Sequence, residues 1–362
     1  TMNRGGYLFD PRPHADRSHY YPLTLAGCFA RAVARAPARP AIIDGELRLS
    51  WADLHRRVHR LATMLAARGL GTGDVIGLGL PNSWEFVAGH LAIAAIGAVT
   101  LPLHVAYGDA EISGLLGRTG ARAAIVLAPR AAFADLETLV VCNPTASRLA
   151  ANAFALAAIF REPSDRPPTP RIDPDDPFVL APTSGTESTV PKICMHAHAG
   201  LLSNATEVAR ESQLGPGDVV LAAGGFTHLF GLLAVHAAIV RGATLVAQAR
   251  YDPDRFLELC VRERVTHAWA VPAQLHDLAE RAGNGEIVSV PDARLGERAT
   301  LVCTLHERST LTLGDVKKFL QTRGVAKYKW PERLLVLDEL PLTPSGKVAK
   351  AAVRGLAARA AS

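Results

Sequence analysis

Apolar positions along the first 280 or so residues alternate between helical spacing and short continuous runs. Four apolar residues, three or four positions apart, share one face of a predicted helix: Leu54, Val58, Leu61 and Leu65. Short apolar runs typical of buried strands lie at residues 74–80, 99–103, 123–127, 178–181, 219–223, 244–247 and 268–271. This alternation predicts a parallel sheet with helices on its faces.

Polar residues mark where several of these helices begin. Ser50 and Asp53 form a capping-box pattern, in which each side chain satisfies a free N–H group of the first turn. Ser83 can cap the next helix. Asp252 is a further cap, and Pro253 fits the first helical position because the missing N–H is not needed there.

The pattern changes after residue 282. Short strands predicted at residues 299–304 and 333–337 flank one helix, which begins with a capping box at Thr312 and Asp315. The predicted core face of that helix consists of Leu313, Val316, Phe319 and Leu320. We therefore predict a large multi-layer α/β N-terminal domain, residues 1–282, and a small α+β C-terminal domain, residues 283–362, of a size that can fold alone.

Composition and charge narrow the possible classes. Hydrophobic residues make up 49% and charged residues 20%, as in globular proteins. The net charge of +5 is not accompanied by clustered basic and aromatic residues, so we expect no nucleic-acid partner. The five cysteines form no CxxC pair, and no apolar run has the length of a membrane span. We expect a cytoplasmic protein without a transmembrane segment, and a homodimer is left open.

A loop rich in hydroxyl groups follows the strand predicted at residues 178–181. Residues 183–192 have the sequence TSGTESTVPK. Glycine lets a backbone approach a ligand closely, consecutive N–H groups form an anion-binding nest, and lysine supplies a positive charge. The GK[ST] spacing of a P-loop is absent. Composition alone leaves two interpretations open, a phosphate-binding loop and a solvated Ser/Thr turn.

This loop resembles the phosphate-binding loop of the adenylate-forming superfamily, which includes acyl- and aryl-CoA synthetases, luciferases and adenylation domains of peptide synthetases. The family pattern is approximately [ST]SG[ST]TGxPKG. Here Glu187 and Ser188 replace the usual Thr-Gly, and Ile193 replaces the last Gly. The resemblance implies that ATP phosphates are bound by Thr183, Ser184, Gly185, Thr186, Glu187, Ser188 and Lys192.

Residues 224–231, GGFTHLFG, resemble an aromatic and histidine-containing turn that lines the acyl pocket in relatives. The resemblance implies that Phe226, His228, Phe230 and Gly231 line this pocket, and that His228 lies near the substrate carboxylate. Without the resemblance, a single histidine in an apolar turn is more often structural. His196 and His198 lie two positions apart on a predicted strand, but no third metal ligand accompanies them, and no metal site is identified.

Residues 340–347, LPLTPSGK, resemble the C-terminal motif P[RK]TxSGKxxR, whose lysine reaches the active site in relatives. Attack of a carboxylate on the α-phosphate brings two anions together, and a cation between them stabilises the developing charge. Lys347 is therefore the candidate catalytic lysine. Lys327 and Lys329 are weaker candidates for contacts with coenzyme A phosphates, because exposed lysines beside Tyr328 need no such role.

Further matches to the family occur in order at residues 73–82, 265–272, 291–298 and 326–331. The resemblance implies that the C-terminal domain is a small lid. It also implies that ATP and a carboxylic acid are the reactants and that Mg²⁺ is the cofactor. The acid would become an acyl-adenylate and then an acyl-CoA thioester. Transfer to the phosphopantetheine thiol of a carrier protein is the alternative within the same class.

One segment of the family has no counterpart. Only residues 273–290 separate Pro272 from Pro291, where relatives carry a much longer stretch that includes a Mg²⁺-binding glutamate and a ribose-binding aspartate. Removing strands from a core would expose apolar surface that folded monomers rarely tolerate. We therefore favour an N-terminal domain that is incomplete in this sequence at its C-terminal end. If the deletion is real, we expect a non-catalytic acyl- or nucleotide-binding remnant.

Overall fold

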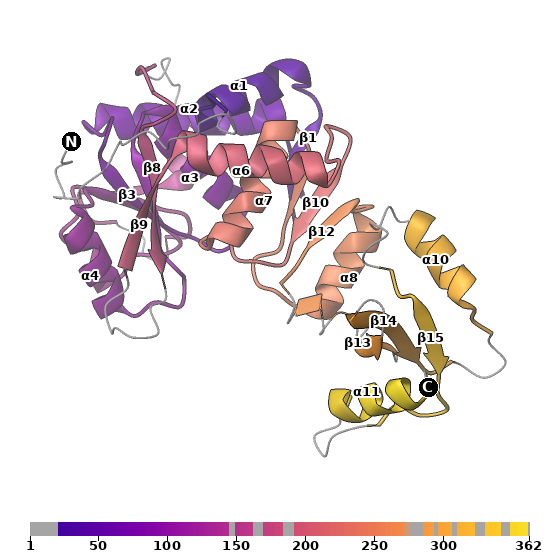
Figure 1. The fold of residues 1–362 in the computed structure, drawn as a ribbon. Coiled ribbons are helices and arrows are strands. Elements are labelled where there is room, and N and C mark those ends of the chain that lie inside the picture. Colours follow the sequence, from indigo (N-terminus) through magenta and orange to yellow (C-terminus); the bar gives the residue numbers. More distant parts are fainter. Residues whose placement is uncertain are drawn as a thin grey trace. The chain divides into compact units, whose positions relative to one another are not determined.

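The structure is a computed structural model that describes residues 21–144, 149–161, 169–183, 192–271, 274–275, 278, 285–292, 296–305, 310–322, 330–341 and 348–360. The chain divides into two units, Thr1–Val271 and Pro272–Ser362, and each is considered by itself (Figure 1). The domain boundary expected after residue 282 stays a prediction, because residues 279–284 lie outside the described residues.

A seven-stranded sheet in the order β7-β6-β5-β3-β4-β8-β9 forms one layer of the first unit. Its strands are β3 (Val75–Gly79), β4 (Val99–Pro102), β5 (Ala123–Val126), β6 (Thr138–Val141), β7 (Ala153–Ala155), β8 (Pro177–Thr183) and β9 (Lys192–Ala197). Neighbouring strands are parallel throughout, except that β8 and β9 form an antiparallel hairpin at the edge.

A five-stranded sheet in the order β12-β10-β11-β1-β2 forms the second layer. Its strands are β1 (Pro40–Asp44), β2 (Leu47–Ser50), β10 (Val219–Ala222), β11 (Thr244–Ala247) and β12 (His267–Trp269). β1 lies parallel to β11, with Ile42 opposite Leu245, and β2 is the antiparallel edge strand. The predicted α/β class with parallel sheets is confirmed.

Helices cover these sheets and fill the space between them (Figure 1). The described helices are α1 (Leu25–Arg35), α2 (Trp51–Ala67), α3 (Trp84–Ala95), α4 (Asp109–Thr119), α5 (Leu156–Ile159), α6 (His198–Glu211), α7 (Leu229–Arg241) and α8 (Pro253–Arg262), with a 3₁₀ turn η1 (Ala131–Phe133). α3 contacts β3 and β4 of one sheet and β1 of the other. It is buried without interruption from Phe86 to Ala94, which explains why its sequence is apolar on all sides.

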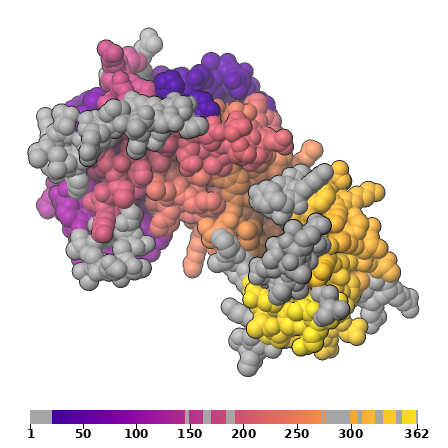
Figure 2. Space-filling model, viewed as in Figure 1, coloured from indigo at the N-terminus to yellow at the C-terminus, as the bar shows by residue number. Residues whose placement is uncertain are grey.

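Local sequence signals for helix starts are confirmed. The reciprocal capping box of Ser50 and Asp53 begins α2, and Ser83 and Asp252 accept hydrogen bonds from the first turns of α3 and α8. Segments that are far apart in sequence meet at the surface: the indigo region of α1 borders later, salmon-coloured parts of the chain (Figure 2), and α1 packs against α7.

The second unit contains a three-stranded sheet of β13 (Gly285–Asp292), β14 (Gly296–Cys303) and β15 (Arg333–Val336), with β13–β14 antiparallel and β14–β15 parallel. Val353 and Ala357 of α11 (Lys350–Arg359) pack against Val302 of this sheet. The capping box of Thr312 and Asp315 begins α10 (Leu313–Thr322) as expected. The predicted core position of Phe319 is wrong, because its side chain is 56% exposed.

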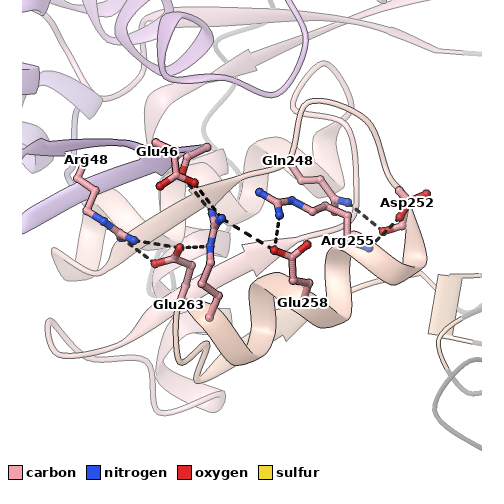
Figure 3. A network of polar contacts seen from close by, with 9 residues as sticks. Glu46, Arg48, Gln248, Asp252, Arg255, Glu258 and Glu263 are labelled. Atoms are coloured by element: carbon pink, nitrogen blue, oxygen red, sulfur yellow. Dashed lines mark hydrogen bonds and ion pairs between the residues drawn. The ribbon is translucent and has the colours of Figure 1, made fainter.

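An ion-pair network connects the C-terminal end of α8 with the β1–β2 hairpin (Figure 3). The buried carboxylate of Glu263 accepts two hydrogen bonds from Arg48, at 2.7 and 3.1 Å, and one from Nε of Arg262, at 2.8 Å. Arg262 also contacts Glu46 at 3.1 Å. The hydrogen bonds from Arg48 are the main reason that the pKa of Glu263 lies below its usual value.

Replacing Glu263 with glutamine should lower the free energy of unfolding by about 2 kcal/mol, because charge-assisted hydrogen bonds to a buried carboxylate are lost. Glu258→Gln is the matched control: its side chain is 53% exposed, so its ion pair with Arg255 should contribute less than about 1 kcal/mol. Urea unfolding of both variants measures the difference. Equal costs for the two substitutions would contradict a stabilising role specific to the buried carboxylate.

Candidate functional site

Several loops arise at the same edge of the seven-stranded sheet, because parallel strands all end on one side. β3, β5 and β8 end there at Gly79, Val126 and Thr183. β4 lies on one side of β3 in the sheet, and the next strand in sequence, β5, lies on the other side. The strand order therefore reverses between β3 and β5, and this position is the topological switch point, called the change point below. In open α/β sheets such a change point is where ligands bind.

A pocket of ≈170 Å³ lies at this change point. Its walls are mostly apolar: Gly79, Leu103, His104, Val105, Ile112, Val126, Leu127, Ala128, Arg130 and Phe133. The guanidinium of Arg130 is held at the pocket by an ion pair with Asp109 at 2.5 Å and by a hydrogen bond to the carbonyl of Tyr107 at 2.9 Å. The pocket therefore offers an apolar wall and one cation whose charge is largely balanced by its partner.

The predicted phosphate-binding loop connects the strands of the β8–β9 hairpin. Thr183 and Lys192 are direct register partners at the loop end of that hairpin. The loop therefore begins at the carboxyl edge of the sheet, on the same side as the pocket. Its residues Ser184, Gly185, Thr186, Glu187 and Ser188 lie outside the described residues, and their contacts with ATP stay a prediction.

The turn at residues 224–231 follows β10 and leads into α7. His228 is the N-cap residue of α7, and its N–H donates to the carbonyl of Gly225 at 3.0 Å. A Cβ atom on Gly231 would lie 2.8 Å from the carbonyl oxygen of Gly224, and closer still to that of Gly225. The backbone is folded back so tightly that only glycine fits at position 231.

Asn82 binds this turn from the neighbouring sheet. It follows β3 at the carboxyl edge, and its side-chain Nδ2 donates to the carbonyl of Gly224 at 3.0 Å. Its Oδ1 accepts from the N–H of Phe226 at 2.6 Å. The loops after β3 and after β10, one from each sheet, are thereby joined. The sequence analysis did not single out Asn82, although it lies in the segment at residues 73–82 that matches the family.

His228 lies at the surface next to His104, with the two ring centres 5.1 Å apart. Partial burial, and then the nearby His104, lower the pKa of His228, which favours a neutral imidazole. Phe226 points into the core, where its ring lies 5.6 Å from that of Phe86. Phe230 is 37% exposed and presents its ring at the surface of the turn. The structure thus brings His104 and His228 together, and the roles of the predicted pocket residues stay predictions.

Three other predicted site residues, Lys327, Lys329 and Lys347, lie outside the described residues, so their roles also stay predictions. His196 and His198 do not share a strand face, because β9 ends at Ala197 and His198 begins α6. Within the part of the chain that the structure describes, no group of three or more His, Cys, Asp or Glu residues could hold a metal ion.

A cluster of buried histidines lies behind these loops, and the sequence analysis missed it. Nε2 of His90 contacts Nε2 of His236 at 3.0 Å, and Nδ1 of His90 contacts Oγ1 of Thr100 at 2.8 Å. The ring of His198 stacks on Phe178 at 4.0 Å and accepts a hydrogen bond from the N–H of Leu25. Burial lowers the pKa of His90 to about 3 and that of His198 to about 4, and burial followed by the neighbouring histidines lowers that of His236.

The fold and the site together indicate a class of protein. Two parallel sheets with intervening helices, a pocket at the change point and a hydroxyl-rich hairpin loop at the same edge are features of α/β proteins that bind nucleotides or other small ligands. Residues 29–320 match the family model described as AMP-binding enzyme, and the chain belongs to this family. The resemblance inferred from the sequence motifs is confirmed.

Three relatives illustrate the similarity. Protein Y of Streptomyces griseus is 34% identical over 281 residues, which cover 74% of this chain and 90% of that protein. The long-chain-fatty-acid–CoA ligase FadD13 of Mycobacterium tuberculosis is 29% identical over 249 residues, 69% of this chain and 49% of FadD13. The pyochelin synthase PchD of Pseudomonas aeruginosa is 29% identical over 367 residues, 93% of this chain and 64% of PchD. The chain thus spans about half of FadD13 and less than two thirds of PchD.

Solved structures show the same fold. The apo structure of MbtA from Mycobacterium smegmatis superposes with a TM-score of 0.65 at 19% identity, and covers 93% of this chain and 95% of MbtA. A fatty acyl CoA synthetase from Mycobacterium tuberculosis superposes with a TM-score of 0.61 at 16% identity, covering 95% of this chain and 99% of that one. None of the described helices is both long and apolar enough to cross a membrane.

Proposed function

We propose that the protein activates a carboxylic acid by joining it to AMP and then transfers the acyl group to the thiol of coenzyme A. The main support for the proposal is the place in the fold where the two predicted substrate-binding loops begin. The loop after Thr183 and the turn containing His228 both arise at the carboxyl ends of parallel strands, in a chain of the AMP-binding family. The name of FadD13, a fatty-acid–CoA ligase, agrees with the proposed acceptor.

The proposed reaction has two steps. A carboxylate oxygen of the acid bonds to the α-phosphorus of ATP, the bond from that phosphorus to the β-phosphate oxygen breaks, and pyrophosphate leaves. The sulfur of a thiolate then bonds to the acyl carbon, the bond from that carbon to the phosphate oxygen breaks, and AMP leaves. The described residues contain no candidate Mg²⁺ ligand set, so no step is derived through the metal.

The chain's own residues would act by binding and by charge. Backbone N–H groups and hydroxyls of residues 183–188, with Lys192, would hold the phosphates. The neutral ring of His228 at the head of α7 would hydrogen-bond the acid's carboxylate without neutralising it, since its pKa lies below the usual value. Lys347 would lie between carboxylate and α-phosphate and stabilise the charge that develops there.

Acid-dependent exchange of radiolabelled pyrophosphate into ATP tests the first step, over a panel of alkyl, alicyclic and aryl acids. Lys347→Ala should lower the exchange rate about 100-fold, the size of effect seen when one charge-stabilising group is removed. Thioester formation from supplied acyl-adenylate should stay largely intact. Lys318→Ala, on α10, is the control and should match the parent protein.

The outcomes of this test are distinct. No exchange with any acid would defeat the proposed activation. Equal loss of both half-reactions in Lys347→Ala would contradict the role given to that lysine. If exchange occurs but the thioester forms only on a phosphopantetheine carrier, that carrier replaces coenzyme A as the proposed acceptor.

A second candidate function rests on chain length. The 281 aligned residues make up 90% of Protein Y of Streptomyces griseus, so this relative is itself a short protein. This supports the alternative in which the short form is real and the protein binds an acyl or nucleotide ligand without catalysis. An intact mass near 38.4 kDa, together with nucleotide binding but no exchange, would favour that alternative.

A further inference from the structure

One face of α3, together with the residue before its N-cap, contacts the segment at residues 224–236 at three levels. Asn82, Phe86 and His90 are spaced four residues apart, close to one helical turn, so side chains at these levels lie above one another. Asn82 binds the turn, Phe86 packs on Phe226, and His90 contacts His236 in the middle of α7. Three contacts in a row therefore hold the start of α7 against α3: a polar contact at Asn82, an apolar contact at Phe86 and a polar contact at His90.

The contact at Asn82 is the one that binds the backbone of the turn. The residue is only 7% exposed, and its side chain binds both a carbonyl and an N–H group of the turn. The N–H belongs to Phe226, whose residue is 1% exposed, so water cannot readily replace the lost partner. Two hydrogen bonds to one planar amide fix both the distance and the orientation of the turn relative to β3.

Contacts within the turn connect the residues that Asn82 binds to His228. The N–H of His228 is bonded to the carbonyl of Gly225, and Gly231 closes tightly on the same part of the backbone. A shift at Gly224 or Phe226 is therefore passed to His228, and not absorbed between them. A displacement of about 1 Å at a substrate-binding group can cost two orders of magnitude in rate.

We propose that Asn82 is a positioning residue: it holds the turn at residues 224–231, and with it His228, in the place that binds the substrate carboxylate. The proposal rests on the proposed acid activation. In this proposal Asn82 acts through the turn and not by contact with a substrate, so its loss should weaken binding of the acid. The loop between Thr183 and Lys192 belongs to a different hairpin, so ATP binding should change little.

The experiment compares Asn82→Ala and Asn82→Asp with Ser83→Ala. Ser83 caps the same helix by accepting from the N–H of Phe86, so its loss weakens α3 without removing a bond to the turn. Asn82→Asp keeps an acceptor for Phe226 but sets a carboxylate oxygen against the Gly224 carbonyl. Benzoate and decanoate serve as probe acids in pyrophosphate exchange, and amide hydrogen exchange is read on peptides covering residues 224–228.

Both Asn82 variants should raise the KM for the acid about ten-fold, while the KM for ATP stays within about two-fold, and Asn82→Ala should speed hydrogen exchange at Phe226 about ten-fold. Ser83→Ala should leave all three quantities close to the parent values. Unchanged protection at Phe226 in Asn82→Ala, equal changes in both KM values, or the same pattern in Ser83→Ala would overturn the proposal. No pyrophosphate exchange in the parent protein would overturn the proposed function instead, and hydrogen exchange would still decide whether Asn82 holds the turn.

Discussion

Lowering the pH from 7 to 5 is expected to remove about 4 kcal/mol of stability from the first unit through His90 and His198, and a further amount through His236. Burial holds His90, His198 and His236 neutral in the folded protein, with pKa values of about 3, about 4 and well below the usual value. In the unfolded chain each has a pKa near 6.5 and gains a proton as the pH falls. The unfolded state then binds more protons, so His90 and His198 each cost about 2 kcal/mol at pH 5, and His236 adds to this cost.

Other groups modify this slope without reversing it. His55 and His196 act in the same direction, because burial lowers their pKa as well. The half-buried carboxyls of Asp44 and Glu85 act in the opposite direction, because burial raises their pKa and they gain protons more easily in the folded state. Domains are commonly stable by only about 5–15 kcal/mol, so the histidine effect can unfold the unit in mild acid.

Urea unfolding at half-unit pH intervals from 7 to 5 measures this dependence. A double variant, His90→Gln with His236→Gln, keeps side chains that can hydrogen-bond but cannot gain a proton in this range. Its stability should fall less steeply with pH than that of the parent, by about 1.2 kcal/mol per pH unit between pH 6 and pH 5 for the loss of His90 and by a further amount for the loss of His236. Parallel stability curves for parent and variant would show that these two histidines are not the cause.

Gly231→Ala is expected to destabilise the first unit by more than about 3 kcal/mol. The added methyl group would overlap the carbonyl oxygens of Gly224 and Gly225, and backbone atoms cannot move aside as the end of a flexible side chain can. Relief would require pulling the turn away from Asn82 and breaking two buried hydrogen bonds. Overpacking combined with lost buried hydrogen bonds gives costs of this size.

Gly114→Ala is the matched control, because it makes the same chemical change in α4 where no atom lies within 4 Å of the new methyl group. Alanine is the better helix former, so this control should be stabilised by up to about 1 kcal/mol. Thermal unfolding of the two variants should therefore move in opposite directions. A Gly231→Ala protein with the melting temperature of the parent would contradict the close approach described for the turn.

Local signals predicted much of the fold. The capping boxes at Ser50 and at Thr312 depend only on residues three positions apart, and both are present. The strand expected at residues 244–247 is β11, with the same bounds. β2 and β6 were missed because neither has a flanking signal strong enough to separate it from a loop, whereas β11 is equally short and was predicted.

Long-range contacts account for what the sequence did not indicate. His90 lies in a uniformly apolar helix, and its partner His236 is 146 residues away, so no local pattern connects the two. Asn82 has the same difficulty, since Gly224 is 142 residues further along. The candidate site was found through motifs at residues 183–192, 224–231 and 340–347, whereas the groups that hold the turn in place became apparent only from the structure.

The position of β1 has a consequence for the time at which the protein can fold. Ile42 of β1 pairs with Leu245 of β11, a separation of 203 residues (245 − 42). At a synthesis rate of about 5–20 residues per second, a ribosome adds those residues in roughly 10–40 s. Throughout that interval the β1–β2 hairpin has an unpaired edge, and α2 has no finished sheet to cover. The N-terminal segment of a newly made chain therefore cannot complete its native sheet until β11 emerges, and its apolar surfaces are open to non-native contacts during that time.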